Sequence, residues 1–194
     1  MAINLSKGQR VSLEKSMRYV LVGLGWDTNR YDGGYDFDLD ASVFMLGVNG
    51  KLLRDEDFVF YNNLVGRDGA VTHTGDNRTG EGEGDDEQII IDLEKIPAEI
   101  DKIAVVVTIH EADIRHQNFG QVDNAYIRLA KLASPDDMVG EEYLRFDLVE
   151  DFSIETAIVV AEIYRRGGDW KFNPIAAGYQ GGLAAICRSF GANV

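Results

Sequence analysis

Acidic side chains are concentrated in two glycine-containing stretches, residues 76–87 and 27–40. The first holds six carboxylates, one arginine and three glycines, and the second holds five aspartates and one arginine. Carboxylates held this close repel each other unless they are solvated, protonated or bound to a shared cation. Glycines allow such loops to turn sharply, and calcium accepts about six to eight oxygen ligands in a loose geometry, whereas magnesium requires a strict octahedron. We therefore expect a calcium site built from these two stretches.

A solvated loop without a metal is the alternative interpretation of any acidic, glycine-rich stretch. Both stretches here adjoin strongly apolar segments, which fix their ends. Asp36, Asp38 and Asp40 alternate with apolar or small residues, so an extended chain places their three carboxylates on one face. Three like charges aligned on one face repel each other unless a cation neutralises them, so this alignment favours a cation site over a solvated loop.

The charge of the chain limits its partners. The 194 residues carry a formal net charge of −14, which argues against direct binding to nucleic acid or anionic membranes without a cation. Bound divalent ions would cancel part of this charge, so transient calcium-dependent membrane contact stays open, whereas stable membrane insertion is not expected. Cys187 is the single cysteine, which excludes an internal disulfide. The chain shows no apolar run of signal-peptide or membrane-spanning length, so we expect a cytoplasmic protein.

The apolar pattern predicts many short strands separated by glycine-rich turns. The main strands are expected at residues 19–26, 38–48, 58–61, 88–93, 102–110, 124–132, 144–148 and 157–165, with shorter extended pieces near 3–5, 11–13, 70–74 and 170–172. A helix is expected at 182–190 and a short helical turn at 96–100. The fold class is therefore all-β: a β-sandwich of two mainly antiparallel sheets with a few short helices, acidic loops at one end, and one domain over residues 1–194.

Other chemistries fit the sequence less well. Residues 76–87 have the length of an EF-hand loop, but Arg78 and Gly80 occupy ligand positions and Glu81 replaces the required glycine. Three histidines and one cysteine do not support a dedicated zinc site, and no nucleophile set can be assembled. Acid–base catalysis needs a carboxyl kept neutral in an apolar pocket, and these loops are expected to be wet and mutually acidic. We therefore expect no enzyme.

Distinctive motifs occur at residues 7–8, 23–27, 36–42, 75–87, 110–112, 118–122 and 124–128. Together they resemble the TerD-domain family of tellurite-resistance and general stress proteins. This resemblance implies a β-sandwich that binds two calcium ions in an acidic pocket between loops at one end, an arrangement similar to that of C2 domains. It also implies a cytoplasmic role in resistance to tellurite and other stresses, without an established enzymatic activity.

Eleven residues are candidate calcium ligands. The main ligands are expected to be Asp36, Asp38 and Asp40 from one strand edge, and Asp76, Asp85, Asp86 and Glu87 from the long loop. A second group of candidates is Asp27, Asn62, Asn77 and Glu111.

The expected function is that of a calcium-binding stress-response protein associated with tellurite resistance. It would act as a calcium-dependent sensor or interaction module, with other proteins of the same resistance system as candidate partners. One alternative is a C2-like module that binds phospholipid or phosphate through calcium. A metal-assisted hydrolase or a tellurite-processing enzyme ranks below it.

Overall fold

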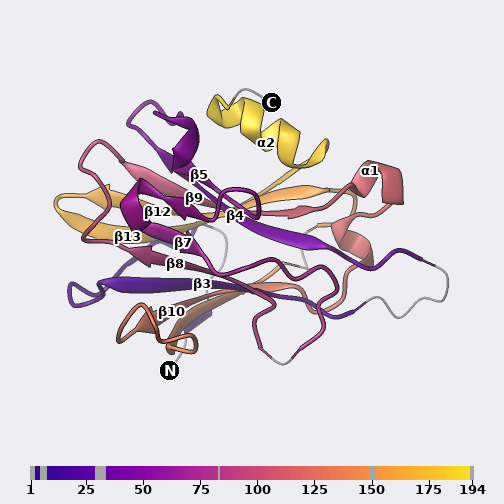
Figure 1. Ribbon diagram of the computed structural model, residues 1–194, viewed down its shortest axis with the longest axis horizontal. Coiled ribbons are helices and arrows are strands. Elements are labelled where there is room, and N and C mark those ends of the chain that lie inside the picture. Colours follow the sequence, from indigo (N-terminus) through magenta and orange to yellow (C-terminus); the bar gives the residue numbers. More distant parts are fainter. Residues whose placement is uncertain (1–2, 5–7, 29–33, 83, 149–151, 193–194) are drawn as a thin grey trace.

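Two β-sheets pack face to face in the computed structural model, which describes residues 3–4, 8–28, 34–82, 84–148 and 152–192 (Figure 1). The seven strands of sheet A are, in order, β1 (Ile3–Asn4), β11 (Glu141–Asp147), β10 (Tyr126–Leu132), β3 (Tyr19–Gly25), β8 (Glu87–Asp92), β7 (Val71–His73) and β6 (Val65–Gly66). The six strands of sheet B are β2 (Val11–Ser12), β13 (Asp169–Tyr179), β12 (Ala157–Arg166), β9 (Lys102–Ile109), β4 (Leu39–Leu46) and β5 (Phe58–Val59). Neighbouring strands are antiparallel except β1 and β11, so the predicted β-sandwich is confirmed.

The core lies between the sheets because each central strand alternates its side chains across them. In sheet A, Val22 and Leu24 of β3 point into this core, and in sheet B so do Ala41 and Val43 of β4. Burying a valine or leucine side chain contributes about 1.5–3 kcal/mol. The outer face of sheet B is also apolar, and helix α2 (Gly182–Phe190) covers it.

Helical segments are short. The α2 helix confirms the expected one, and Cys187 on it is buried. Helix α1 (Ala112–Arg115) follows β9, and single 3₁₀ turns are η1 (Asp55–Asp57), η2 (Arg67–Gly69) and η3 (Phe119–Gln121). Residues 96–100, where a short helical turn was expected, form a connection with a single hydrogen-bonded turn, in which the Ile100 N–H donates to the Pro97 carbonyl at 3.1 Å. None of the helices in the described part of the chain has the length and apolarity needed to cross a bilayer.

Strand β13 is much longer than the sequence predicts. The sequence predicts that the strand ends at Phe172, because Pro174 cannot donate a hydrogen bond to a neighbouring strand. A register shift between Val159 and Ala161 of β12 lies opposite this part of β13, and Pro174 pairs with Ala161. The irregularity lets β13 continue to Tyr179.

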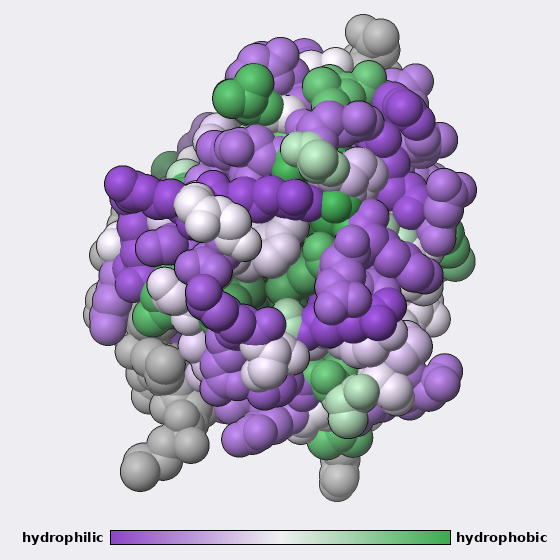
Figure 2. Space-filling model, turned by 90° about the vertical axis from the view of Figure 1, so that its left-hand side faces the viewer, coloured by the Kyte–Doolittle hydropathy of each residue, from purple (hydrophilic) through white to green (hydrophobic). Residues whose placement is uncertain are grey.

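The acidic stretches lie at one end of the sandwich. This is the right-hand side of Figure 1, where β4 and β8 begin and where α1 lies. The opposite end shows hydrophilic side chains around a narrow apolar band (Figure 2). The described parts of residues 27–40 and 76–87 therefore meet, as predicted, at a single end.

Candidate metal site

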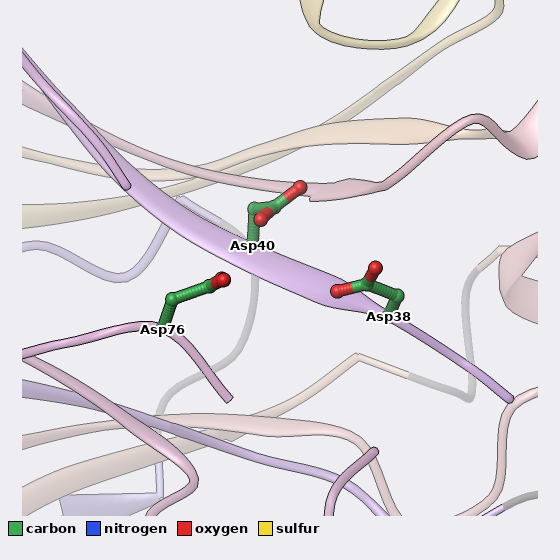
Figure 3. A group of neighbouring side chains, drawn as sticks. All are labelled: Asp38, Asp40 and Asp76. Atoms are coloured by element: carbon green, nitrogen blue, oxygen red, sulfur yellow. The ribbon is translucent and has the colours of Figure 1, made fainter. Parts of the chain in front are cut away.

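Three aspartates from two separate segments bring their carboxylates together. Asp38 and Asp40 flank Leu39, whose side chain points into the core, so alternation turns both carboxylates to the opposite face of β4. Asp76 comes from the loop between β7 and β8 and points toward them (Figure 3). One carboxylate oxygen of each residue lies within 4.8 Å of the others. Asp38 and Asp40 are buried, whereas Asp76 is exposed.

The cluster opens into a cavity of about 320 Å³. The remaining lining residues are polar or aromatic: Tyr35, Asp36, Tyr61, Arg78, Thr79, His110 and Arg115. Asp36 therefore faces the same cavity from an exposed position. The aspartates bring carboxylate oxygen atoms to the cavity, and oxygen atoms are the ligands that hard cations prefer.

Trp26 joins the two acidic stretches. Its indole Nε1 donates a hydrogen bond to the Phe37 carbonyl at 2.9 Å, immediately before Asp38. Gly80 of the long loop packs against the same ring, and a Cβ there would lie 2.6 Å from Nε1. Gly80 also has a φ of +70°, so only glycine fits without strain.

Asn77 shapes the long loop from within. Its Oδ1 accepts hydrogen bonds from the backbone N–H groups of Thr79 at 3.1 Å and Gly80 at 3.2 Å. This is the turn that asparagine forms with its own backbone. Its Nδ2 donates to Asp86 Oδ1 at 3.1 Å. Asn77 was a candidate ligand, but these contacts give it a structural role.

Glu87 connects the two sheets rather than lining the cavity. Its Oε2 accepts a hydrogen bond from the Ala41 backbone N–H at 2.7 Å, and its Oε1 accepts one from Asn77 N–H at 3.3 Å. The buried His73 Nε2 lies 3.4 Å from Oε2. Burial raises the pKa of Glu87. The side chain fixes the edge of β4 beside Asp40.

The two buried carboxylates of the cluster, Asp38 and Asp40, resist ionisation. Burial raises the pKa of Asp40 to about 8, with further contributions from the charges of Glu87, Asp38 and Asp76. Burial also raises the pKa of Asp38, although His110 and Arg115 oppose this. Without a cation, Asp40 is therefore mostly protonated at neutral pH. A cation would remove this penalty by replacing the proton.

Asp85 is a correction to the predicted ligand set. Its carboxylate forms a two-point ion pair with Arg128 at 2.7 and 2.7 Å, and it also accepts a hydrogen bond from Gln88 Nε2 at 2.9 Å. It lies over Gly23, where a Cβ would meet the carboxylate at 2.3 Å. Gly23 alternates with the core residues Val22 and Leu24, so Asp85 lies on the outer face of sheet A.

The other candidates lie outside the cluster as well. Asp86 accepts a hydrogen bond from Trp26 N–H at 2.9 Å, and burial raises its pKa. Asp27 accepts one from Asn124 Nδ2 at 2.8 Å. Asn62 lines a separate groove beside Phe58 and Phe60. The structure therefore does not bring these three expected ligands together with Asp38, Asp40 and Asp76.

Glu111 lies next to the cavity, in an adjoining groove that also includes Asp40. Its Oε2 is 3.7 Å from Arg115 Nη2. The sequence did not identify Arg115, Tyr61 or Tyr35 as cavity residues. His110 could have been found from strand pairing, because its N–H donates to the Asp38 carbonyl at 2.8 Å.

Fold and site together define the class of this protein: a two-sheet β-sandwich with a carboxylate-lined cavity at one end. The sequence matches the TerD domain family over residues 1–190, and the chain belongs to this family. It is 56% identical over 196 residues to tellurium resistance protein TerD of Serratia marcescens, covering 100% of this chain and 99% of the relative. It is 55% identical over 197 residues to general stress protein 16U of Bacillus subtilis (strain 168), covering 100% of both.

A solved structure supports the fold. A homologue of telluride resistance protein (TerD) from Streptomyces coelicolor A3(2) matches with a TM-score of 0.74 and 23% identity. The match covers 92% of this chain and 100% of that chain. The sandwich architecture is therefore shared at low sequence identity.

Proposed function

We propose that the chain binds Ca²⁺ through Asp38, Asp40 and Asp76, and that this binding supports a role in stress response and tellurium resistance. The observation that carries the proposal is the convergence of three carboxylates from two segments within 4.8 Å of one another. Two of them are buried, at a cost in free energy that a bound cation would offset.

Calcium fits this donor set better than other common metals. Two oxygens bound to one Ca²⁺ at about 2.4 Å can be up to about 4.8 Å apart, so small side-chain movements would bring all three carboxylates onto one ion. Magnesium binds at about 2.1 Å and would require the carboxylates to close up into an octahedron. Zinc prefers nitrogen or sulfur ligands together with fewer oxygens. A second calcium ion remains a prediction, which the measured stoichiometry will test.

The role in stress and tellurium resistance is supported by the names of relatives. Both relatives described above are at least 55% identical and match essentially from end to end. At that similarity we infer a shared physiological role. Calcium would order residues 76–87 through Asp76 and residues 34–40 through Asp38, and the ordered loops would form a contact surface for a protein partner.

We propose a binding module rather than a catalyst, although one sequence argument for this was wrong. The loops were expected to keep no carboxyl neutral, yet the pKa of Asp40 is raised to about 8. A protonated Asp40 could donate a proton only in the metal-free state, because a bound cation takes the place of that proton. Calcium binding and acid catalysis would therefore exclude each other at this residue.

Thermal denaturation tests the proposal. A ligand that binds only the folded state stabilises it, by about 2.7 kcal/mol at a hundred times its Kd. For a chain of this size we expect calcium to raise Tm by about 5–10 °C over the chelated protein. Asp76→Asn should abolish most of this increase, whereas Asp136→Asn, an exposed aspartate of the β10–β11 connection, should retain it. An equal response of both variants would contradict the assignment.

A further inference from the structure

Each carboxylate of the cluster faces one nitrogen-bearing side chain. Arg115 Nη1 lies 3.4 Å from Asp38 Oδ2, and Arg78 Nε lies 2.9 Å from Asp76 Oδ2. His110 Nδ1 lies 3.7 Å from Asp40 Oδ2. The cavity thus already contains positive charge at the place where a cation would bind.

Arg115 is held in this position, whereas Arg78 is not. The Arg78 side chain is 77% exposed and can turn into solvent. The Arg115 side chain is 17% exposed and ends α1. It is restrained by Glu111 Oε2 at 3.7 Å and by the ring of Tyr35, whose centroid is 5.8 Å from the guanidinium carbon. These contacts hold Arg115 beside the cluster.

The contact between Arg115 and Asp38 differs from the structural ion pairs of this protein. Arg128 donates two hydrogen bonds to the Asp85 carboxylate, both 2.7 Å long, and Arg18 donates two to the Asp92 carboxylate, 3.2 and 3.0 Å long. Arg115 reaches Asp38 through one nitrogen at 3.4 Å, near the limit for a hydrogen bond. It supplies charge to the cavity without saturating the carboxylate, so Asp38 keeps free oxygen lone pairs for a cation.

We propose that Arg115 is a built-in counter-ion that sets the calcium affinity of this site. It balances part of the negative charge when no cation is bound, and it repels the cation that replaces it. Arg115 touches no bound metal in this scheme and acts through the field that it imposes on the cluster. The inference rests on the proposed function, because it requires that calcium binds here.

Calorimetric titration of Arg115→Gln with calcium chloride tests the inference. A unit charge about 6 Å from a divalent ion opposes its binding by roughly tenfold even at the dielectric constant of water. We therefore expect Arg115→Gln to bind calcium about tenfold more tightly. The same variant, without calcium, should unfold at a lower temperature than the parent because Asp38 has lost its balancing charge. The two effects have opposite signs.

Two further variants test whether the effect of Arg115 comes from its charge at this position. Arg115→Lys keeps the charge and should bind calcium within about twofold of the parent. Arg54→Gln makes the same change in net charge at an exposed position before η1, and its affinity should also stay unchanged. If Arg115 only held the loops in place, Arg115→Gln would weaken calcium binding, and that result would overturn the inference. Unchanged affinity in Arg115→Gln would overturn it too. A parent protein that binds no calcium would instead refute the proposed function, and this inference with it.

Discussion

Replacing Arg128 with methionine is expected to destabilise the protein by about 3–5 kcal/mol, because the change leaves a buried carboxylate without its counter-charge. The Asp85 side chain is 0% exposed and that of Arg128 is 13% exposed. Both guanidinium contacts to Asp85 are 2.7 Å long, and Tyr126 adds a hydrogen bond from its hydroxyl at 3.2 Å. Burial, followed by the nearby Asp85 charge, raises the pKa of Tyr126 to about 12, so its hydroxyl stays protonated.

Urea unfolding in the presence of a chelator measures this effect. Arg145→Met is the matched control, because Arg145 stacks over the Tyr126 ring at 3.6 Å but is 39% exposed. Its loss should cost no more than about 1 kcal/mol. Adding Asp85→Asn to Arg128→Met should recover part of the lost stability, since the unpaired charge is then gone. A loss below about 1 kcal/mol in Arg128→Met would show that the pair is not structural.

In the absence of calcium, stability is expected to fall as the pH rises toward 8, because of Asp40. Its pKa is about 8 in the folded state against an ordinary value of 3.8, so the folded protein holds this proton more strongly than the unfolded chain. The resulting stabilisation is complete below the unfolded pKa and is lost as the pH rises through the folded pKa. The largest possible slope is about 1.4 kcal/mol per pH unit.

Unfolding curves at pH 6, 7, 8 and 9 with a chelator test this dependence. Asp40→Asn should remove most of the slope and should exceed the parent in stability at the alkaline end. Asp36→Asn is the control, because Asp36 lines the same cavity but is exposed. It should follow the parent curve. If stability changed with pH in the same way in the parent and in Asp40→Asn, Asp40 would not be the group responsible for the pH dependence.

The part of the site that lies on β4 could be predicted from the sequence. Strand alternation has a fixed period of two, so Asp38 and Asp40 must share a face wherever the strand lies. The position of Asp76 beside that face does not follow from alternation, because it requires both acidic stretches to lie at the same end of the sandwich, as they do in the structure. Only the resemblance to the TerD-domain family implied that arrangement.

The partners of the Asp85, Asp86 and Glu87 side chains could not be predicted from the sequence. These three adjacent carboxylates point in different directions: to Arg128 on the outer face of sheet A, to the backbone of Trp26, and to the backbone of β4. Their separation depends on β8 beginning at Glu87 and on β10 lying two strands away across β3. Composition and spacing contain neither fact. The same holds for Arg115, which reaches the cavity because α1 follows β9 and ends at Arg115, next to Asp38.

Calorimetric titration of chelator-stripped protein with calcium tests the central claim most directly, when the parent is compared with Asp38→Asn and Asp85→Asn. Both variants remove one carboxylate from the predicted ligand set, but the structure puts only Asp38 at the cavity. We expect strong calcium heat from the parent and from Asp85→Asn, with a much weaker magnesium response, and little calcium heat from Asp38→Asn. No heat from the parent at millimolar calcium, or loss of binding in Asp85→Asn with binding kept in Asp38→Asn, would contradict the account.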